Sequence, residues 1–262
     1  MGFSEYAAEL KAFAAAAEES LLVVDSVGST SSFARRLVDR FREHHWRPPD
    51  LAIVAWSQTH GRGRGDHGWL SPPGSGVYVT SLRGVALSRA QLAAAPIAVA
   101  VALAEAVGEW LPRPPGLKWP NDLLVDGRKL GGVLIEAVST GHEEPMLLVG
   151  VGLNYSATAA GERWPAEATA LAEAVDEGRL PSLAAATFRV IEAIDDAVEA
   201  PAAATIIDRY RELSVHRPGE SIRVRIRDEI VAGRFVAFDA TGHLKLETRD
   251  GARRISTGEL ID

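Results

Sequence analysis

Two apolar segments in the middle of this 262-residue chain carry glycine where a buried strand normally carries a large side chain. Gly131 and Gly132 open one of these segments, and Gly150 and Gly152 lie inside the other. Glycine weakens a strand because it packs no side chain, so its presence indicates that another group approaches the backbone closely. The two pairs of glycines therefore predict one pocket lined by both segments.

The periodicity of the apolar residues predicts a mixture of strands and helices. Asp126-Gly127, between two short apolar runs, is the strongest hairpin signal in the chain. Ser88 and Gln91 form a capping-box pattern before a long apolar helix, which we expect to bend or restart at Pro96. Strands are expected at residues 21–24, 51–56, 77–82, 123–125, 128–130, 133–136 and 146–154, helices at 30–44, 88–110, 182–199 and 202–213, and loops at 111–116 and 155–180.

The turn-rich segment at residues 216–219 separates two different patterns. Before it, strands and helices are mixed, which indicates an α+β domain over residues 1–215. After it, Ile222 and Val224 alternate with arginines, and glycine turns separate short strands. Residues 216–262 are therefore expected to form a small all-β domain of the barrel type.

Composition restricts the classes of protein to which the chain can belong. It has 47% hydrophobic residues, no cysteine and a formal net charge of −7, so a large core is expected and thiolate chemistry is excluded. An acidic chain is a poor general binder of nucleic acid, which requires clustered positive charge. The N-terminus carries glutamates in place of the basic start of a signal peptide, and no apolar window is expected to span a bilayer. We therefore expect a cytoplasmic protein.

A glycine-rich loop with two arginines, Gly61-Arg62-Gly63-Arg64-Gly65, follows the strand at residues 51–56. Alternate glycines allow backbone N–H groups to come close to a ligand, and guanidinium groups suit phosphate or carboxylate oxygens. The loop can therefore hold an acyl phosphate. A mobile arginine-glycine loop and an RNA-binding patch are the alternatives that this segment alone leaves open.

Two further segments carry candidate polar groups. Ser29, Thr30 and Ser31 stand at the start of a predicted helix, where N–H groups and hydroxyls can bind an anion, with simple capping as the alternative. Lys118 precedes the predicted hairpin and is expected to bind or act on a ligand, the alternative being a surface salt bridge. Asp122, at the start of that hairpin, either holds Mg²⁺ or caps the turn.

In this order, the motifs resemble the biotin protein ligase family from Leu21 to the end of the chain. The resemblance implies a class II synthetase-like catalytic domain, with a central mixed β-sheet flanked by helices, followed by an SH3-like β-barrel. It also implies that the biotin carboxylate attacks the α-phosphorus of ATP to give biotinyl-adenylate, and that a carrier lysine then takes the acyl group. The segments that carry it are Gly28-Ser29-Thr30, Gln58, the glycine-arginine loop, Trp69, Lys118-Trp119-Pro120-Asn121-Asp122, Arg128-Lys129-Leu130-Gly131-Gly132, Gly150-Val151-Gly152-Leu153-Asn154 and Ala168-Thr169-Ala170-Leu171.

The same resemblance implies roles for individual residues. Lys118 and Arg64 would be catalytic, since positive charge stabilises the crowded oxygens of the carboxylate and the α-phosphate. Trp69 would stack on adenine, with a place in the core as its alternative. Biotin would be bound by Ser29, Thr30, Ser31, Gln58, Gly61, Arg62, Gly63, Arg64, Lys118 and Gly131, and the nucleotide by Arg62, Arg64, Trp69, Lys118, Asn121, Gly132 and Asn154.

The resemblance also implies substrates and a partner. ATP with Mg²⁺ and biotin would be substrates, without a tightly bound cofactor, and the partner would be the biotin carboxyl carrier domain of an acyl-CoA carboxylase. A lipoate or octanoate ligase of the same superfamily is the second enzyme hypothesis, and a nucleic-acid-binding or scaffold protein is the non-enzyme one. Both a monomer and a homodimer are compatible with the sequence.

The chain departs from the family pattern at the helix start and in the loop. The family usually has Asn where this chain has Ser31, and Gly and Arg where it has Asp66 and His67. An acidic residue beside phosphates opposes the charge that the loop supplies, so we expect weaker retention of the adenylate, or a shifted loop with Gly65 as its flexible point. About twenty residues precede the first strand, too few for the winged helix-turn-helix of DNA-binding relatives, so a ligase without repressor function is expected.

Overall fold

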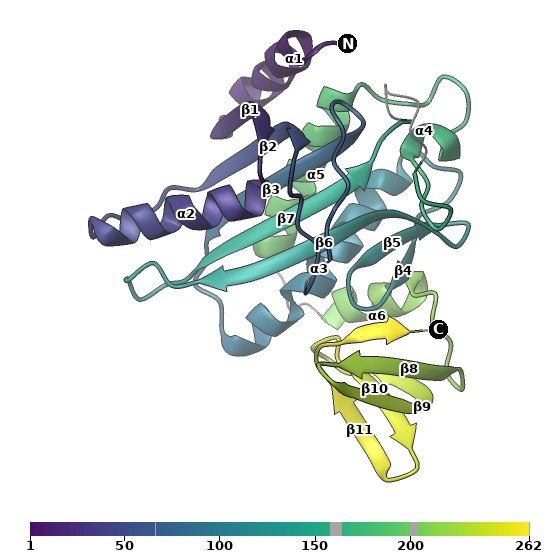
Figure 1. Ribbon diagram of the computed structural model, residues 1–262. Helices are drawn as coiled ribbons and strands as arrows, with labels where there is room; N and C mark the ends of the chain where they lie inside the picture. The colour runs from purple at the N-terminus through teal and green to yellow at the C-terminus, as the bar shows by residue number, and fades with distance from the viewer. Residues whose placement is uncertain (66, 158–163, 200–203, 262) are drawn as a thin grey trace.

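A seven-stranded sheet forms the centre of the computed structural model, in the spatial order β1-β2-β3-β7-β6-β5-β4 (Figure 1). β1 and β2 run parallel, and the other neighbouring strands run antiparallel, so the sheet is mixed as expected. The structure describes all residues except 66, 158–163, 200–203 and 262. The strands are β1 (Leu21–Val27), β2 (Leu51–Gln58), β3 (Gly76–Gly84), β4 (Gly116–Lys118), β5 (Asp122–Val125), β6 (Arg128–Val138) and β7 (Met146–Asn154).

Helices cover both faces of this sheet (Figure 1). On β2, Ile53 packs with the residues of α2, whereas Ala52 and Val54 belong to the core on the side of α3 and α5. This division follows from the alternation of side chains along a strand. The helices are α1 (Phe3–Ala16), α2 (Thr30–Glu43), α3 (Arg89–Gly108), α4 (Leu171–Ala174), α5 (Leu183–Glu199) and α6 (Ala204–Leu213).

A separate five-stranded antiparallel sheet follows α6, in the order β11-β10-β9-β8-β12. This C-terminal sheet confirms the expected small β domain. Its two edge strands, β11 and β12, are not paired with each other among the described residues. The domain boundary predicted at residue 216 falls between α6 and β8 and stays a prediction. The strands are β8 (Ser221–Ile226), β9 (Glu229–Phe238), β10 (Leu244–Thr248), β11 (Gly251–Ile255) and β12 (Glu259–Ile261).

β6 is a single long strand that contains a bulge, where two short strands were predicted. Leu123 of β5 pairs with Gly131, and the next residue, Leu124, pairs with Lys129. Leu130 is therefore an extra residue on β6, which shifts the alternation of side chains by one position.

Other elements also differ from the sequence-based expectation. Residues 116–118 form β4, because they pair with β5 at the edge of the sheet, and the predicted loop contains α4. α3 begins at the expected capping box and is a single helix that includes Pro96. Residues 202 and 203 of the last predicted helix and residues 158–163 of the predicted loop lie outside the described residues.

We expected no segment of the sequence to be long and apolar enough to span a membrane, and this expectation is wrong as far as length and composition are concerned. Residues Gln91–Gly108 of α3 meet the length and hydropathy of a spanning helix, and 61% of that window is buried. Because α3 packs against α5, α6 and β6, its apolar residues are covered by the protein itself. α3 is therefore a core helix of this fold.

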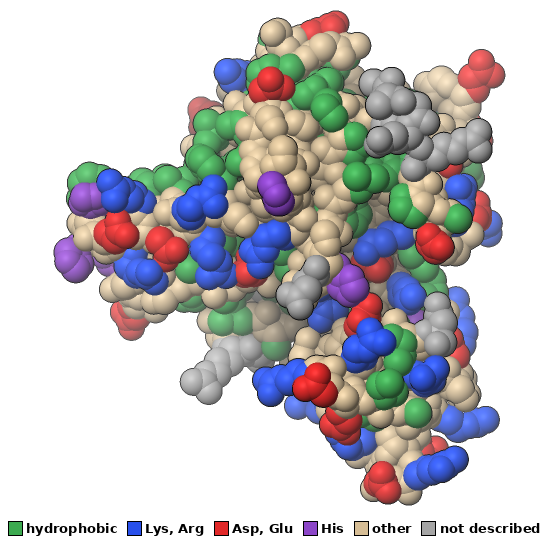
Figure 2. Space-filling model, in the orientation of Figure 1, with side chains coloured by type: hydrophobic (Ala, Val, Ile, Leu, Met, Phe, Trp, Pro, Cys, Tyr) green, Lys and Arg blue, Asp and Glu red, His purple; other side chains and the backbone are tan. Residues whose placement is uncertain are grey.

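Charged side chains of both signs are interspersed over α2 and the C-terminal sheet (Figure 2). On α2, for example, Arg40 pairs with Glu43 and Arg42 pairs with Asp39. Compensated charge of this kind does not favour a general nucleic-acid surface.

Candidate functional site

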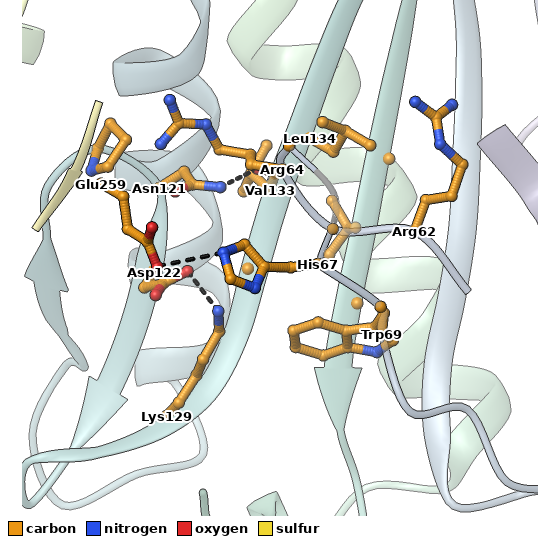
Figure 3. Close-up of a pocket in the computed structure, with 18 of the residues that line it drawn as sticks. Arg62, Arg64, His67, Trp69, Asn121, Asp122, Lys129, Val133, Leu134 and Glu259 are labelled. Carbon is orange, nitrogen blue, oxygen red and sulfur yellow. Dashed lines mark hydrogen bonds and ion pairs between the residues drawn. The ribbon is translucent and has the colours of Figure 1, made fainter. Parts of the chain in front are cut away.

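A cavity of about 820 Å³ lies between the central sheet, the glycine-arginine loop and the C-terminal sheet (Figure 3). Gly132 of β6 and Gly152 of β7 pair directly, and Gly150 lies two residues before Gly152. A Cβ atom at Gly152 would lie 2.3 Å from the indole of Trp69, so only glycine lets that ring lie against the strand. All three glycines line the cavity, which confirms the shared pocket that their positions predict.

A chain of hydrogen bonds connects three polar residues of the cavity wall to Thr80 and Ser71. The hydroxyl oxygens of Ser31 and Thr80 are 3.1 Å apart, and Thr80 Oγ1 donates to Thr30 Oγ1 at 2.8 Å. Gln58 Oε1 accepts from the backbone N–H of Thr30 at 2.8 Å and from its hydroxyl at 3.2 Å. Gln58 Nε2 donates to Ser71 Oγ at 2.8 Å. Because an amide nitrogen carries two hydrogens, Gln58 retains a second donor for a ligand.

Thr80 and Ser71 belong to this hydrogen-bond network, although neither was predicted from the sequence. Thr80 is 0% exposed and Ser71 is 4% exposed, and neither lines the cavity. They hold Thr30, Ser31 and Gln58, which do line it, in fixed orientations. A hydroxyl residue in the apolar run at residues 77–82 was the only sequence signal for Thr80.

Three predicted biotin-binding residues do not belong to the cavity lining. Ser29 caps α2, accepting the N–H of Ser32 at 3.4 Å, as the capping alternative predicts. The carbonyl of Gly61 accepts the N–H of Trp69 at 2.8 Å and so closes the base of the loop. Gly131 packs against the backbone of β7.

The glycine-arginine loop folds as a short hairpin. The N–H of Gly63 donates to the carbonyl of His67 at 2.8 Å. Gly65 lies at the tip with φ +58°, in the left-handed region that glycine adopts readily. Asp66, which led to the prediction of weak adenylate retention, lies outside the described residues.

The two arginines of the loop both line the cavity but bind different parts of the protein. Arg62 pairs with Glu136 of β6 at 3.2 Å, whereas Arg64 donates to the turn before β12. Burial lowers the pKa of Arg64, while the carboxylates of Asp122 and Glu259 raise it. A guanidinium remains protonated despite such a shift, so Arg64 is a permanent cation.

Lys118 and Lys129 also line the cavity. Lys129 Nζ lies 2.7 Å from Asp122 Oδ1, whereas Lys118 has no carboxylate within 4 Å among the described residues. No separate role was predicted for Lys129 from the sequence. Regular alternation would turn Lys129 and Gly132 to opposite faces, and the bulge at Leu130 brings both to the cavity.

Trp69 is half-buried and lies between β7 and a lysine. Its ring centroid is 5.4 Å from Lys129 Nζ, and its indole lies against Gly152. The indole nitrogen is buried and has no hydrogen-bond partner among the described residues. Trp69 thus lines the cavity with an unused donor.

Asn121 and Asn154 hold neighbouring backbone segments. The side chain of Asn121, which lines the cavity, donates to the carbonyl of Val133 (Figure 3). Asn154 is not part of the lining, and its amide donates to the carbonyls of Thr169 at 2.9 Å and Lys129 at 3.3 Å. The predicted nucleotide-binding residue Asn154 therefore fixes the backbone of a cavity lysine.

The backbone beside Lys118 is fixed by residues that follow α6. Trp119 donates its backbone N–H to His216 Nε2 at 3.2 Å and its indole N–H to the carbonyl of Gly242 at 3.0 Å. Burial lowers the pKa of His216; the carboxylate of Glu220 opposes this shift and the charge of Lys118 adds to it. Because Nε2 accepts a hydrogen bond, the neutral imidazole is the form that fits this contact.

The cavity is positively charged although the chain is acidic overall. Arg225 and Arg227 of the C-terminal sheet, which the sequence analysis did not identify, contribute to this charge. No group of three or more His, Cys, Asp and Glu residues that could hold a metal occurs among the described residues. The charged lining comprises the cations Arg62, Arg64, Lys118, Lys129, Arg225 and Arg227, and the carboxylates Asp122 and Glu259.

Two family profiles match the chain. That of the Biotin/lipoate A/B protein ligase family matches residues 25–154, and that of the Biotin protein ligase C terminal domain matches residues 219–261. The first range includes the loop, β6 and β7, and the second includes the C-terminal sheet.

Individual proteins show the same similarity. The chain is 27% identical over 239 residues to the bifunctional ligase/repressor BirA of Escherichia coli, covering 88% of this chain and 70% of that protein. It is 36% identical over 118 residues to the biotin–[acetyl-CoA-carboxylase] ligase of Paracoccus denitrificans, covering 41% and 47%. The solved structure of the biotin protein ligase from Aquifex aeolicus in complex with biotin and ATP matches with a TM-score of 0.70 and 25% identity, covering 92% of this chain and 97% of that one.

Proposed function

Since this chain belongs to the biotin protein ligase family, we propose that it activates biotin with ATP and attaches it to a lysine of a carrier protein. The main observation in support of this proposal is that one cavity contains both a neutral hydrogen-bonding pocket and a cationic wall. The ring of biotin needs donors and acceptors, whereas a carboxylate that attacks a triphosphate needs positive charge. Membership of a ligase family favours an enzyme over the scaffold and nucleic-acid-binding alternatives.

Thr30, Ser31 and Gln58 would bind the ureido ring of biotin. Gln58 offers its second N–H to the ring carbonyl, and the two hydroxyl oxygens can accept from the ring N–H groups. Ser29 would support this pocket by fixing the start of α2. We expect the ring to enter without rearrangement of the pocket, because its polar groups are already oriented.

The cationic wall would promote the first step. A carboxylate oxygen of biotin attacks the α-phosphorus of ATP, and the bond from this phosphorus to the bridging oxygen breaks, releasing pyrophosphate. Lys129, Lys118, Arg62 and Arg64 would offset the negative charge that gathers on these oxygens. Mg²⁺ would arrive with ATP as part of the substrate.

The nucleotide would lie on the side of Trp69. Its indole is positioned by Gly152 and Lys129, and it would stack on adenine. Asn121 and the open backbone at Gly132 lie on the same wall and would contact the nucleotide.

In the second step, the amine of a carrier lysine attacks the acyl carbon and AMP leaves with the electron pair of the broken acyl–oxygen bond. We propose the biotin carboxyl carrier domain of an acyl-CoA carboxylase as the acceptor and the cytoplasm as the location. The name of the Paracoccus denitrificans relative, a ligase for acetyl-CoA carboxylase, supports this class of acceptor. That the chain lacks repressor activity stays a prediction, which an operator-binding assay tests.

Mass spectrometry of a reaction with biotin, ATP, Mg²⁺ and a carrier domain tests the proposal. We expect pyrophosphate, AMP and a carrier that has gained one biotinyl group. A protein that releases no pyrophosphate under these conditions is not this ligase. A thermal-shift series with biotin and lipoate separates the two enzyme hypotheses, because only a ligand that binds the folded state raises its melting temperature.

A further inference from the structure

The tip of the glycine-arginine loop contacts a turn of the C-terminal sheet that lies nearly 200 residues later in the chain. Arg64 donates to the carbonyl of Gly258 at 3.1 Å and to the hydroxyl of Thr257 at 3.0 Å. His67 Nε2 lies 3.1 Å from Glu259 Oε1 (Figure 3). All of these residues line the cavity, so the contact closes one of its sides.

The two sides of the loop are held by different domains. Arg62, on one side, pairs with Glu136 of the central sheet, while Arg64 and His67 bind the C-terminal sheet. The base of the loop is fixed by backbone hydrogen bonds, whereas Gly65 at its tip adopts a left-handed φ of +58°. The position of the tip therefore depends on the C-terminal sheet.

We propose that Glu259 is a positioning residue that holds the loop over the cavity and so retains the acyl-adenylate until the acceptor amine arrives. This inference rests on the proposed function. Glu259 also pairs with Arg225 of β8 at 3.2 Å, which orients its carboxylate toward the loop independently of His67. Replacing His67 alone therefore removes its contact with Glu259 and leaves in place both the pairing of Glu259 with Arg225 and the hydrogen bonds of Arg64.

The test measures how much adenylate escapes from the site. Purified protein is supplied with biotin, ATP, Mg²⁺ and serum albumin, which is too large to enter the cavity and carries no acceptor motif. The readout is the ratio of albumin biotinylation to pyrophosphate release, which a general loss of activity does not change. The side chains of His67 and Glu259 are both more than a third exposed, so we expect His67→Gln and Glu259→Gln each to raise this ratio about two- to fivefold.

The variants His67→Gln/Glu259→Gln, His67→Arg and Glu229→Gln complete the design. The double variant should match the single ones, and His67→Arg should give a low ratio like that of the unmodified protein, because arginine can form an ion pair with Glu259. Glu229→Gln removes an exposed carboxylate that pairs with Arg253 in the same sheet outside the cavity, and it should leave the ratio unchanged.

An unchanged ratio in both single variants, additive effects in the double variant, or an equal rise in Glu229→Gln would overturn the inference. Absence of pyrophosphate release from the unmodified protein would instead overturn the proposed function.

Discussion

The cavity has a neutral side and a cationic side that are built in different ways. The neutral side consists of Thr30, Ser31 and Gln58, which line the cavity, and of Ser71 and Thr80 behind them, whose polar groups pair with the first three. All but Gln58 are buried. The cationic side consists of Arg62, Arg64, Lys118 and Lys129, which are more exposed and three of which are held by contacts with carboxylates or with the C-terminal sheet.

This difference indicates that the two sides of the cavity have different functions. Buried hydrogen bonds in a low-dielectric setting fix the orientation of neutral groups, and breaking one leaves an unpaired polar atom. Ion pairs at a solvated surface are weak, so Lys129 and Arg62 can exchange Asp122 and Glu136 for substrate oxygens at little cost. The neutral side therefore suits recognition, and the cationic side suits a reaction in which anions enter, change and leave.

The largest expected effect is on the cationic side. Lys129→Ala should lower the rate of pyrophosphate release about 100-fold or more, because it removes a cation next to the reacting oxygens. Lys118→Ala should lower it less, about tenfold, since Lys129 Cε lies 3.5 Å from the position of a Cβ atom at Gly132, whereas Lys118 is not among the three nearest neighbours of Gly132, Gly150 or Gly152. Lys245→Ala, on an exposed position of β10, is the control and should be unchanged. A greater loss in Lys118→Ala than in Lys129→Ala would make Lys118 the principal cation.

Two glycines of β7 allow the two sides to be separated. A Cβ atom at Gly150 would lie 2.8 Å from Ser31 Oγ, and one at Gly152 would lie 2.3 Å from the ring of Trp69. Gly150→Ala should therefore raise the KM for biotin about tenfold and leave that for ATP unchanged, and Gly152→Ala should do the reverse. Gly84→Ala, on β3 with only ordinary contacts, is the matched control. If both variants raise both KM values equally, the two sides are not independent.

The sequence predicted the strands, the helices and the glycine-lined pocket because these depend on local periodicity and on residue type, whereas the mixed sheet was implied by the resemblance to the ligase family. It missed Lys129 because the bulge at Leu130 depends on how β6 pairs with β5, which no local pattern encodes. Arg225 and the support given by Thr80 were missed because both depend on contacts between distant segments. The capping role of Ser29, by contrast, could be predicted from the local sequence, where it was the alternative to ligand binding.

Thr80 tests whether the neutral side works as a unit. Thr80→Val removes the hydroxyl that bonds Thr30 and Ser31, and we expect a loss of about 1–3 kcal/mol in the free energy of unfolding. The KM for biotin should rise a few-fold while that for ATP stays constant, and Thr80→Ser should behave like the unmodified protein. Ser81→Ala is a stringent control, because the hydroxyl of Ser81 is equally buried but has no hydrogen-bond partner among the described residues. Equal destabilisation by Thr80→Val and Ser81→Ala would contradict a connected network.

The smallest expected effect is on the pH dependence of the free energy of unfolding, through His216, which accepts the backbone N–H of Trp119 beside Lys118. Burial lowers the pKa of His216 in the folded state, so at pH values below the ordinary value of about 6.5 the unfolded chain binds more protons than the folded one. The free energy of unfolding should therefore decrease as the pH falls from 7.5 to 5.5.

His216→Gln, whose amide oxygen can still accept the N–H of Trp119, should show a weaker decrease in urea unfolding experiments at the two pH values. Parallel pH profiles for the two proteins would show that His216 does not contribute. The neutral side contains only hydroxyl and amide groups, which do not titrate in this range, so the affinity for biotin should not change between pH 7.5 and 5.5. This contrast distinguishes the two sides in the unmodified protein.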